Sequence, residues 1–171
     1  MVFMALIGKG TEYALHCLLY LIDLPAGASL TIGDLAEFQG VSQSYLAKIF
    51  TKLKKAGLVS SSIGSKGGYE IARSPENISF LDVVLAVEGE INFFECRKIL
   101  TGTVIYKDTS EKPKWLASPC EIHKIMLQAE ESVRTVLANN TLASLSRDVG
   151  KKLSKEEMKT ISDWLRERSG Q

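Results

Sequence analysis

Two cysteines and one histidine are of types suited to redox chemistry or metal binding. Cys120 and His123 are three positions apart at the predicted start of a helix, so their side chains share one face. A thiol at a helix N-terminus lies near the positive end of the helix dipole, which favours the reactive, metal-binding thiolate. Cys96 lies in an irregular stretch before this helix. Cys17 falls among the apolar positions of another predicted helix, where we expect a core side chain.

Lysines are concentrated in one part of the chain. Between Phe38 and Tyr69 there are five lysines and no acidic residue, although the net charge of the whole chain is only +1. Lysines clustered on a helix and a neighbouring turn are typical of contact with nucleic-acid phosphates. A solvated helix face is the alternative interpretation. The five are Lys48, Lys52, Lys54, Lys55 and Lys66.

The stretch that contains these lysines is predicted to form a helix, a tight turn, a second helix and a glycine-rich hairpin. Thr31 with Asp34 is typical of an N-terminal cap, and Gly40 suits the turn between two crossed helices. Ser42 caps a second helix whose apolar residues recur at i, i+3, i+4 and i+7. Gly57 ends this helix, and two strands follow around a glycine-rich turn. We therefore predict a winged helix-turn-helix within a mostly helical fold that has a small β-wing.

The start of the second helix carries the side chains that we expect to read base edges, because this end of a recognition helix enters the major groove. Gln43 can pair with adenine, Ser44 can donate or accept, and the Tyr45 ring can cover a thymine methyl group. Ser42 is close enough for a base or a phosphate. Residues further along the helix meet the DNA backbone, so we assign phosphate contacts to Lys48, Lys52 and Lys55.

Length and composition indicate an ordinary globular protein. A chain of 171 residues suffices for one domain with an appendage, and 45% hydrophobic with 24% charged residues is usual for this class. The near-neutral balance excludes a general nucleic-acid coat protein. The apolar start of the chain is too short for a signal peptide or a membrane span, and three widely spaced cysteines favour a reducing compartment. We expect a cytoplasmic protein without membrane contact.

A long apolar stripe follows Ser118-Pro119, which is typical of a helix start. The stripe runs from Ile122 to Leu137 and needs a partner surface. A two-fold copy of the same helix would suit a palindromic DNA site, and packing onto its own domain is the alternative. We therefore expect a homodimer that binds a palindromic operator in double-stranded DNA. A last helix, predicted from Ser154, has no assigned function; its apolar face comprises Met158, Ile161, Trp164 and Leu165.

Four motifs resemble the Rrf2 family of bacterial winged-helix regulators, of the IscR, NsrR and CymR type: KGTEYALHCLLYLI, VSQSYLAKIFTKLKKAGLVSS, GGYEIAR and FLDVVLAVEG. The resemblance runs from about residue 9 to about residue 145. It implies a repressor that dimerises through the long helix and touches a phosphate with Lys9. Two positions depart from the family pattern, because Ala47 replaces a glutamate and Ile63 replaces a wing arginine. Lys66 is the substitute that we expect in the wing, and the operator is not transferable from relatives.

The resemblance also implies a sensor. Cluster-binding relatives have three cysteines in this region; Cys96 and Cys120 match the outer two, His123 matches a ligand of one branch, and the middle cysteine is missing. One interpretation is an iron–sulfur cluster held by these three residues and an acidic residue such as Glu95. The second, which we slightly prefer, is a cluster-free switch in which Cys96 or Cys120 is oxidised, nitrosylated or paired. The third is that these residues sense nothing.

We divide the chain into a winged helix-turn-helix domain (1–90), an irregular sensor segment (91–118) and a part with the dimerisation and C-terminal helices (119–171). An enzyme is not expected, because Cys120 and His123 lack an orienting third group and an oxyanion hole. The GSKGG turn also lacks a Walker lysine–serine pair, and the cysteine spacing is not that of a structural zinc site. The alternative function is a regulator without a redox sensor that docks another protein through its winged helix or dimer surface.

Overall fold

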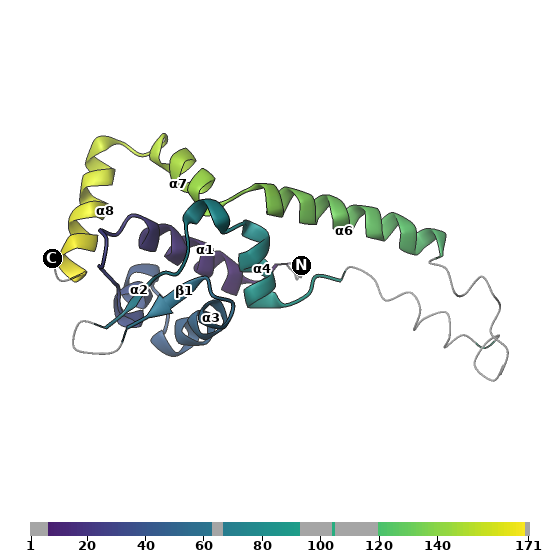
Figure 1. Ribbon diagram of the computed structural model, residues 1–171, viewed down its shortest axis with the longest axis horizontal. Helices are drawn as coiled ribbons and strands as arrows, with labels where there is room; N and C mark the ends of the chain where they lie inside the picture. Colours follow the sequence, from purple (N-terminus) through teal and green to yellow (C-terminus); the bar gives the residue numbers. More distant parts are fainter. Residues whose placement is uncertain (1–6, 63–66, 93–103, 105–119, 170–171) are drawn as a thin grey trace. The chain divides into compact units, whose positions relative to one another are not determined.

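The computed structural model of the chain describes residues 7–62, 67–92, 104 and 120–169 (Figure 1). The chain forms two compact units, one of Met1–Gly89 with Leu137–Gln171 and one of Glu90–Val136. The described part is mostly helical with a two-stranded antiparallel sheet, which confirms the predicted fold class. Its elements are α1 (Lys9–Ile22), α2 (Ile32–Gln39), α3 (Gln43–Lys55), β1 (Val59–Ser61), β2 (Tyr69–Ile71), the 3-10 helix η1 (Pro75–Asn77), α4 (Phe80–Glu88), α6 (Glu121–Asn139), α7 (Leu142–Gly150) and α8 (Lys155–Arg168).

Helices α2 and α3 form the helix-turn-helix, and the predicted caps fix their ends. The Thr31 hydroxyl accepts the Asp34 N–H at 3.1 Å, and the Asp34 carboxylate accepts the Thr31 N–H at 3.0 Å. These two bonds complete a capping box. Gly40 follows α2 with a φ of 64°, in the left-handed region that favours glycine. The Ser42 side chain accepts the N–H of Tyr45 and so begins α3 directly after the turn.

Strands β1 and β2 form the base of the predicted wing, with Val59 opposite Ile71. Tyr69 also exchanges two backbone hydrogen bonds with Leu30, at 2.8 and 3.1 Å, so the loop before α2 joins the sheet edge. A Cβ on the preceding Gly68 would lie 2.6 Å from the Leu30 carbonyl oxygen. This close backbone approach therefore requires glycine.

The core of the first unit is built around α1, whose Cys17 and Leu18 are fully buried. Helix α4 packs against α1, and Glu88 at its end connects the two. Its carboxylate accepts the Gly8 N–H at 3.1 Å and the Thr11 hydroxyl at 2.7 Å. Because Gly8 has no side chain to cap α1, a negative charge from α4 satisfies the helix start instead.

Helix α7 packs with the first unit. The Leu142 N–H donates to the Ile78 carbonyl at 2.9 Å, and the Leu142 side chain is fully buried. The Thr141 side chain accepts the N–H of Ser144 and so begins this helix, which continues to Gly150. The division of the chain at residues 90 and 118 stays a prediction, although α7 and α8 belong to the same unit as the winged helix.

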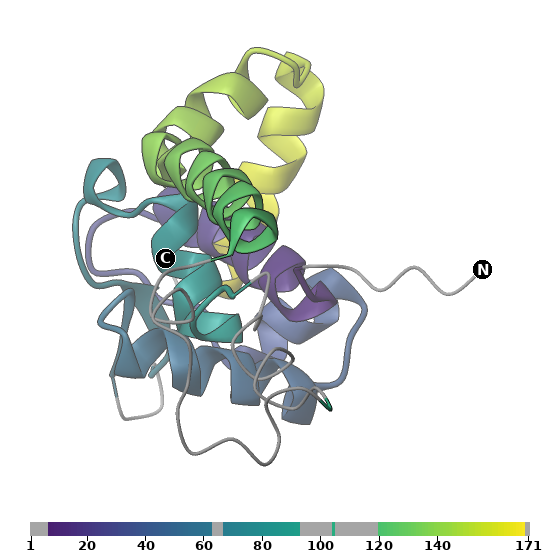
Figure 2. The same cartoon turned by 90° about the vertical axis from the view of Figure 1, so that its right-hand side faces the viewer.

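Helix α8 reaches the helix-turn-helix. The Trp164 ring lies 4.7 Å from the Phe38 ring of α2, measured between centroids. Arg168 donates two hydrogen bonds of 3.1 Å to the Glu37 carboxylate, also on α2. Figures 1 and 2 both show α1 between the α2–α3 pair and the α7–α8 pair. Helix α8 therefore packs against α2, the first helix of the helix-turn-helix.

Helix α6 provides most of the described residues of the second unit. Arg134 fixes it locally through ion pairs of 3.1 Å with Glu130 and with Glu90. Its predicted apolar stripe contains strongly exposed side chains, namely Ile122 (64%), Ile125 (66%) and Val136 (62%). In the described ranges, the helices are all too short or too polar to cross a membrane.

Candidate nucleic-acid interface

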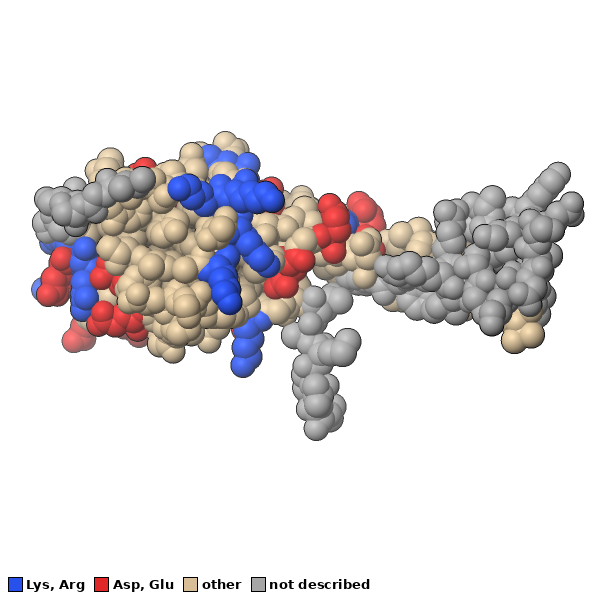
Figure 3. Space-filling view, turned by 90° about the horizontal axis from the view of Figure 1, so that it is seen from below, with Lys and Arg blue, Asp and Glu red and all other residues tan. Residues whose placement is uncertain are grey.

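Helix α3 buries one face in the core and exposes the other. The predicted phosphate contacts Lys48, Lys52 and Lys55 are all on the exposed face. Figure 3 views the molecule from the side on which α3 lies and shows Lys and Arg side chains gathered there. An exposed basic helix of this kind suits the DNA backbone. Its opposite face is anchored by Leu46, Ile49, Phe50 and Leu53.

The predicted base-reading side chains stand together at the exposed start of α3. Ser42, Gln43, Ser44 and Tyr45 all have exposed positions, and the hydroxyl oxygens of the two serines are 3.4 Å apart. The Gln43 amide lies close to Gly33 at the start of α2. A Cβ built on Gly33 would be only 3.0 Å from the amide nitrogen. The glycine therefore leaves room for the amide group that we expect to meet a base.

Tyr45 has a packing contact that sequence patterns do not reveal. Its side chain is 39% exposed, yet its ring meets the Tyr13 ring of α1 edge-on, with centroids 5.9 Å apart. A Cβ on Gly10 would lie 3.6 Å from the Tyr45 hydroxyl. The start of α1 therefore lies beside α3, and Lys9, its exposed first residue, is near the recognition helix.

Two lysines of α3 have partners within the protein. The Lys52 ammonium donates to the Val87 carbonyl of α4 at 2.5 Å, and the Lys54 ammonium donates to the Ser61 hydroxyl of β1 at 2.5 Å. Since an ammonium group can donate more than one hydrogen bond, Lys52 still has capacity for a phosphate. Lys66, the predicted wing contact, lies outside the described residues.

Cys120 lies directly before α6, where its sulfur accepts the His123 N–H at 3.4 Å. The thiol therefore caps the helix start, a position that favours a thiolate. With His123 it offers two donors one turn apart, fewer than an iron–sulfur cluster needs. Cys96 and Glu95 lie outside the described residues, and within those residues His, Cys, Asp and Glu form no group of three that could hold a metal ion.

Cys17 is confirmed as a core residue. Its side chain is 0% exposed, and burial raises the pKa of its thiol to about 12. A thiol that stays protonated and inaccessible is a poor nucleophile and a poor metal ligand. Of the three cysteines, Cys17 is therefore excluded from redox chemistry in the folded protein.

Comparison with known proteins identifies the family. The Rrf2 family model, described as an iron-dependent transcriptional regulator, matches residues 7–148. The chain belongs to the Rrf2 family. A relative from Bacillus subtilis (strain 168), YwgB, is named as a candidate HTH-type transcriptional regulator and is 29% identical over 157 residues, which are 92% of each chain.

Solved structures of Rrf2 proteins have the same fold. The oxidized form of Staphylococcus aureus CymR is 26% identical, covers 82% of this chain and 94% of its own, and has a TM-score of 0.59. IscR of T. potens has a TM-score of 0.61 at 24% identity, with 90% of this chain and 95% of that chain covered. As a member of the Rrf2 family, this protein is a DNA-binding winged-helix transcriptional regulator and not an enzyme. Helix α8 lies beyond the matched residues.

Proposed function

We propose that this Rrf2 protein is a homodimeric, sequence-specific repressor of the cytoplasm, with DNA affinity controlled by redox or nitrosative chemistry at Cys96 and Cys120. The observation that carries the DNA role is the exposed start of α3 beside exposed lysines of the same helix. In this proposal Ser42, Gln43, Ser44 and Tyr45 meet base edges or nearby phosphates. The phosphate contacts come from Lys9, Lys48, Lys52, Lys55 and Lys66.

The exposed apolar stripe of α6 supports the homodimer. A helix of 19 residues is about 28 Å long, long enough to form an interface along its whole length. A two-fold copy would cover Ile122, Ile125 and Val136 and present two recognition helices to a palindromic site. Replacing Ile125 with Glu should therefore yield monomers in sedimentation experiments, with Glu131→Gln on the same helix as the control. A monomeric wild type would contradict the proposal.

The position of Cys120 supports the redox control. Its sulfur lies at the helix start and accepts the His123 N–H, so a thiolate would be favoured there. Pairing with Cys96 would remove both thiol protons and one electron pair, which a peroxide would accept as it is reduced to water. A disulfide or another oxidised state at the foot of α6 would change the spacing of the two recognition helices. The solved CymR at 26% identity is an oxidized form of that protein.

An iron–sulfur cluster remains the alternative sensor, because the family is described as iron-dependent. Cys120 and His123 would hold it together with Cys96 and an acidic residue such as Glu95. A bound cluster would supply a one-electron redox centre.

Protein purified without oxygen would separate these sensors. Our proposal predicts a colourless protein without stoichiometric iron and sulfide, in which hydrogen peroxide changes DNA affinity and a thiol reductant restores it. Cys96→Ser and Cys120→Ser should abolish the change while leaving reduced-state binding intact. Visible charge-transfer bands with stoichiometric iron and sulfide would replace the thiol switch with a cluster. A colourless wild-type protein whose affinity for DNA is unchanged by hydrogen peroxide would contradict redox control.

A further inference from the structure

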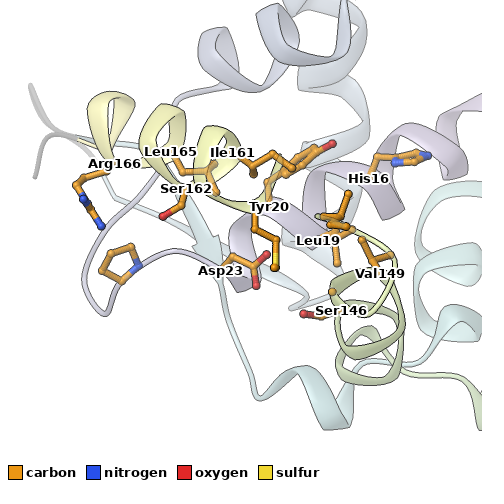
Figure 4. Close-up of a pocket in the computed structure, with 14 residues that line it drawn as sticks. His16, Leu19, Tyr20, Asp23, Ser146, Val149, Ile161, Ser162, Leu165 and Arg166 are labelled. Atoms are coloured by element: carbon orange, nitrogen blue, oxygen red, sulfur yellow. The ribbon is translucent and has the colours of Figure 1, made fainter. Parts of the chain in front are cut away.

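A cavity of about 520 Å³ lies between α1, α7 and α8 in the first unit (Figure 4). This volume is within the range of small-molecule sites in proteins. None of the residues assigned to DNA contact line it, so the cavity is separate from the proposed nucleic-acid interface. Its walls are predominantly apolar and include Leu19, Val149, Leu153, Met158, Ile161 and Leu165.

A few polar side chains interrupt these apolar walls. In Figure 4 the Asp23 carboxylate lies toward the middle of the cavity, whereas Arg166 and His16 lie at its opposite ends. An apolar cavity with few placed polar groups is typical of a site that orients one small ligand. Asp23 is therefore the group best placed to select the ligand's charge.

Asp23 is incompletely compensated in the protein alone. It has a hydrogen bond with Ser146, but burial outweighs this bond and raises the pKa of its carboxyl group above the usual value. Among the described residues, Asp23 takes part in no ion pair. Asp23 as a residue is exposed, so its carboxylate loses only part of its hydration beside the apolar walls, and an incoming cation would stabilise its charge.

We propose that this cavity binds a small apolar amine, whose ammonium group pairs with Asp23 and whose apolar body lies against Leu19, Ile161 and Leu165. The volume admits a bicyclic ring system with a short chain. The mainly apolar lining excludes highly polar metabolites, because their polar groups would be left without partners. The charge at Asp23 disfavours carboxylates placed at the centre of the cavity.

Residues that line the cavity also connect to the helix-turn-helix through aromatic contacts. Tyr20 lines the cavity, and its ring lies 4.4 Å from the Phe38 ring of α2, which in turn packs on Trp164 of α8. Leu165 lines the cavity next to Trp164 along α8. A bound amine would therefore stabilise α8 against α2 and reduce local opening of the first helix of the DNA-binding motif. An effect on DNA binding rests on the proposed function, whereas binding of the amine does not.

Three dansyl probes test the site on the purified full-length protein without DNA. Dansylcadaverine carries an amine, dansylamide is neutral and dansylglycine carries a carboxylate, so one fluorophore reports on three charges. We expect a saturable fluorescence rise with the tightest binding for dansylcadaverine. Asp23→Asn should weaken dansylcadaverine about ten-fold or more and leave dansylamide unchanged. Asp148→Asn is the matched control, because Asp148 is an α7 aspartate outside the cavity that pairs with Lys151.

A second variant and a second measurement guard against a general loss of folding. Ser162→Phe extends a ring into the cavity from an exposed position of α8 and should block all three probes without lowering the melting temperature. Amide hydrogen exchange should slow in α2 and α8 when dansylcadaverine is added. The proposal is overturned by the absence of a saturable signal, by unchanged dansylcadaverine affinity in Asp23→Asn, or by preferred dansylglycine binding that Arg166→Gln abolishes.

Discussion

Lys52 joins the recognition helix to the end of α4, so its removal should affect the fold as well as DNA binding. Its ammonium donates to the Val87 carbonyl at 2.5 Å, in the last turn of α4. Carbonyls at this end of a helix lack intrahelical partners, and a cation there is favoured by the helix dipole. A hydrogen bond to a charged group contributes about 1.5–3 kcal/mol, and solvent screening at this exposed side chain reduces the figure to about 1 kcal/mol.

Lys52→Ala should therefore lower the free energy of unfolding by about 1 kcal/mol, which lowers the Tm by about 2–4 °C for a chain of this size. Lys48→Ala is the matched control, because Lys48 is an exposed lysine on the same helix. It should stay within about 0.5 kcal/mol of wild type. Urea unfolding and thermal melts, followed by far-UV circular dichroism, measure both changes.

The same two variants should weaken DNA binding alike. Each lost phosphate contact should reduce the slope of log K against log salt by about 0.9 per protomer, or about 2 for a dimer on its operator. The loss should be equal on operator and unrelated duplexes, because phosphates carry no sequence information. Equal stability of Lys52→Ala and Lys48→Ala would refute the structural role of Lys52. An unchanged salt slope in both would refute their phosphate contacts.

Three further variants test the base-reading site, the wing and the cavity. Tyr45→Ala should lower the discrimination between operator and scrambled DNA by about 1–3 kcal/mol. Tyr45→Phe is the control that keeps the ring packing. Equal losses of affinity for both DNAs would show that Tyr45 does not read a base. Gly68→Ala should destabilise the protein by about 1–3 kcal/mol, because its Cβ would meet the backbone of Leu30. Gly150→Ala is the control: a Cβ there has open space, so thermal melts should show a stability close to that of wild type. Asp23→Asn should raise stability near neutral pH, since burial raises the carboxyl pKa and the folded state then binds more protons than the unfolded state between the two pKa values. The stability gained by Asp23→Asn should disappear below the carboxyl pKa of the unfolded state, where Asp23 is protonated in both the folded and the unfolded protein. A stability difference between variant and wild type that does not change with pH would contradict a raised carboxyl pKa.

The fold of the DNA-binding motif could be predicted because its determinants are local. The caps at Thr31 and Ser42 and the apolar spacing of α3 act over one or two turns, so sequence spacing alone indicates them. The contact of Glu88 with Gly8 spans 80 positions and has no local pattern. The same holds for Arg168, whose position on a helix face is readable from the sequence but whose partner on α2 is not.

In the candidate site, too, local features could be predicted from the sequence, whereas contacts between distant residues could not. The spacing of Cys120 and His123 indicated one helical turn, and the structure places the Cys120 sulfur on the His123 N–H. The hydrogen bond from Lys52 to Val87 depends on the packing of α3 against α4, so a charge pattern identifies an exposed lysine without its partner. The cavity beside Asp23 is likewise formed by three helices that are distant in sequence.

Selection from fragmented genomic DNA, followed by a salt titration of affinity, would show whether this protein binds duplex DNA in a sequence-specific and salt-dependent way. We predict enrichment of a palindromic site and a steep fall of log K with log salt. The quadruple variant with Gln43, Ser44, Lys48 and Lys55 all replaced by Ala should lose both properties while remaining folded. A wild-type protein that enriches no sequence and shows a flat salt dependence would contradict the account and favour a regulator that docks another protein.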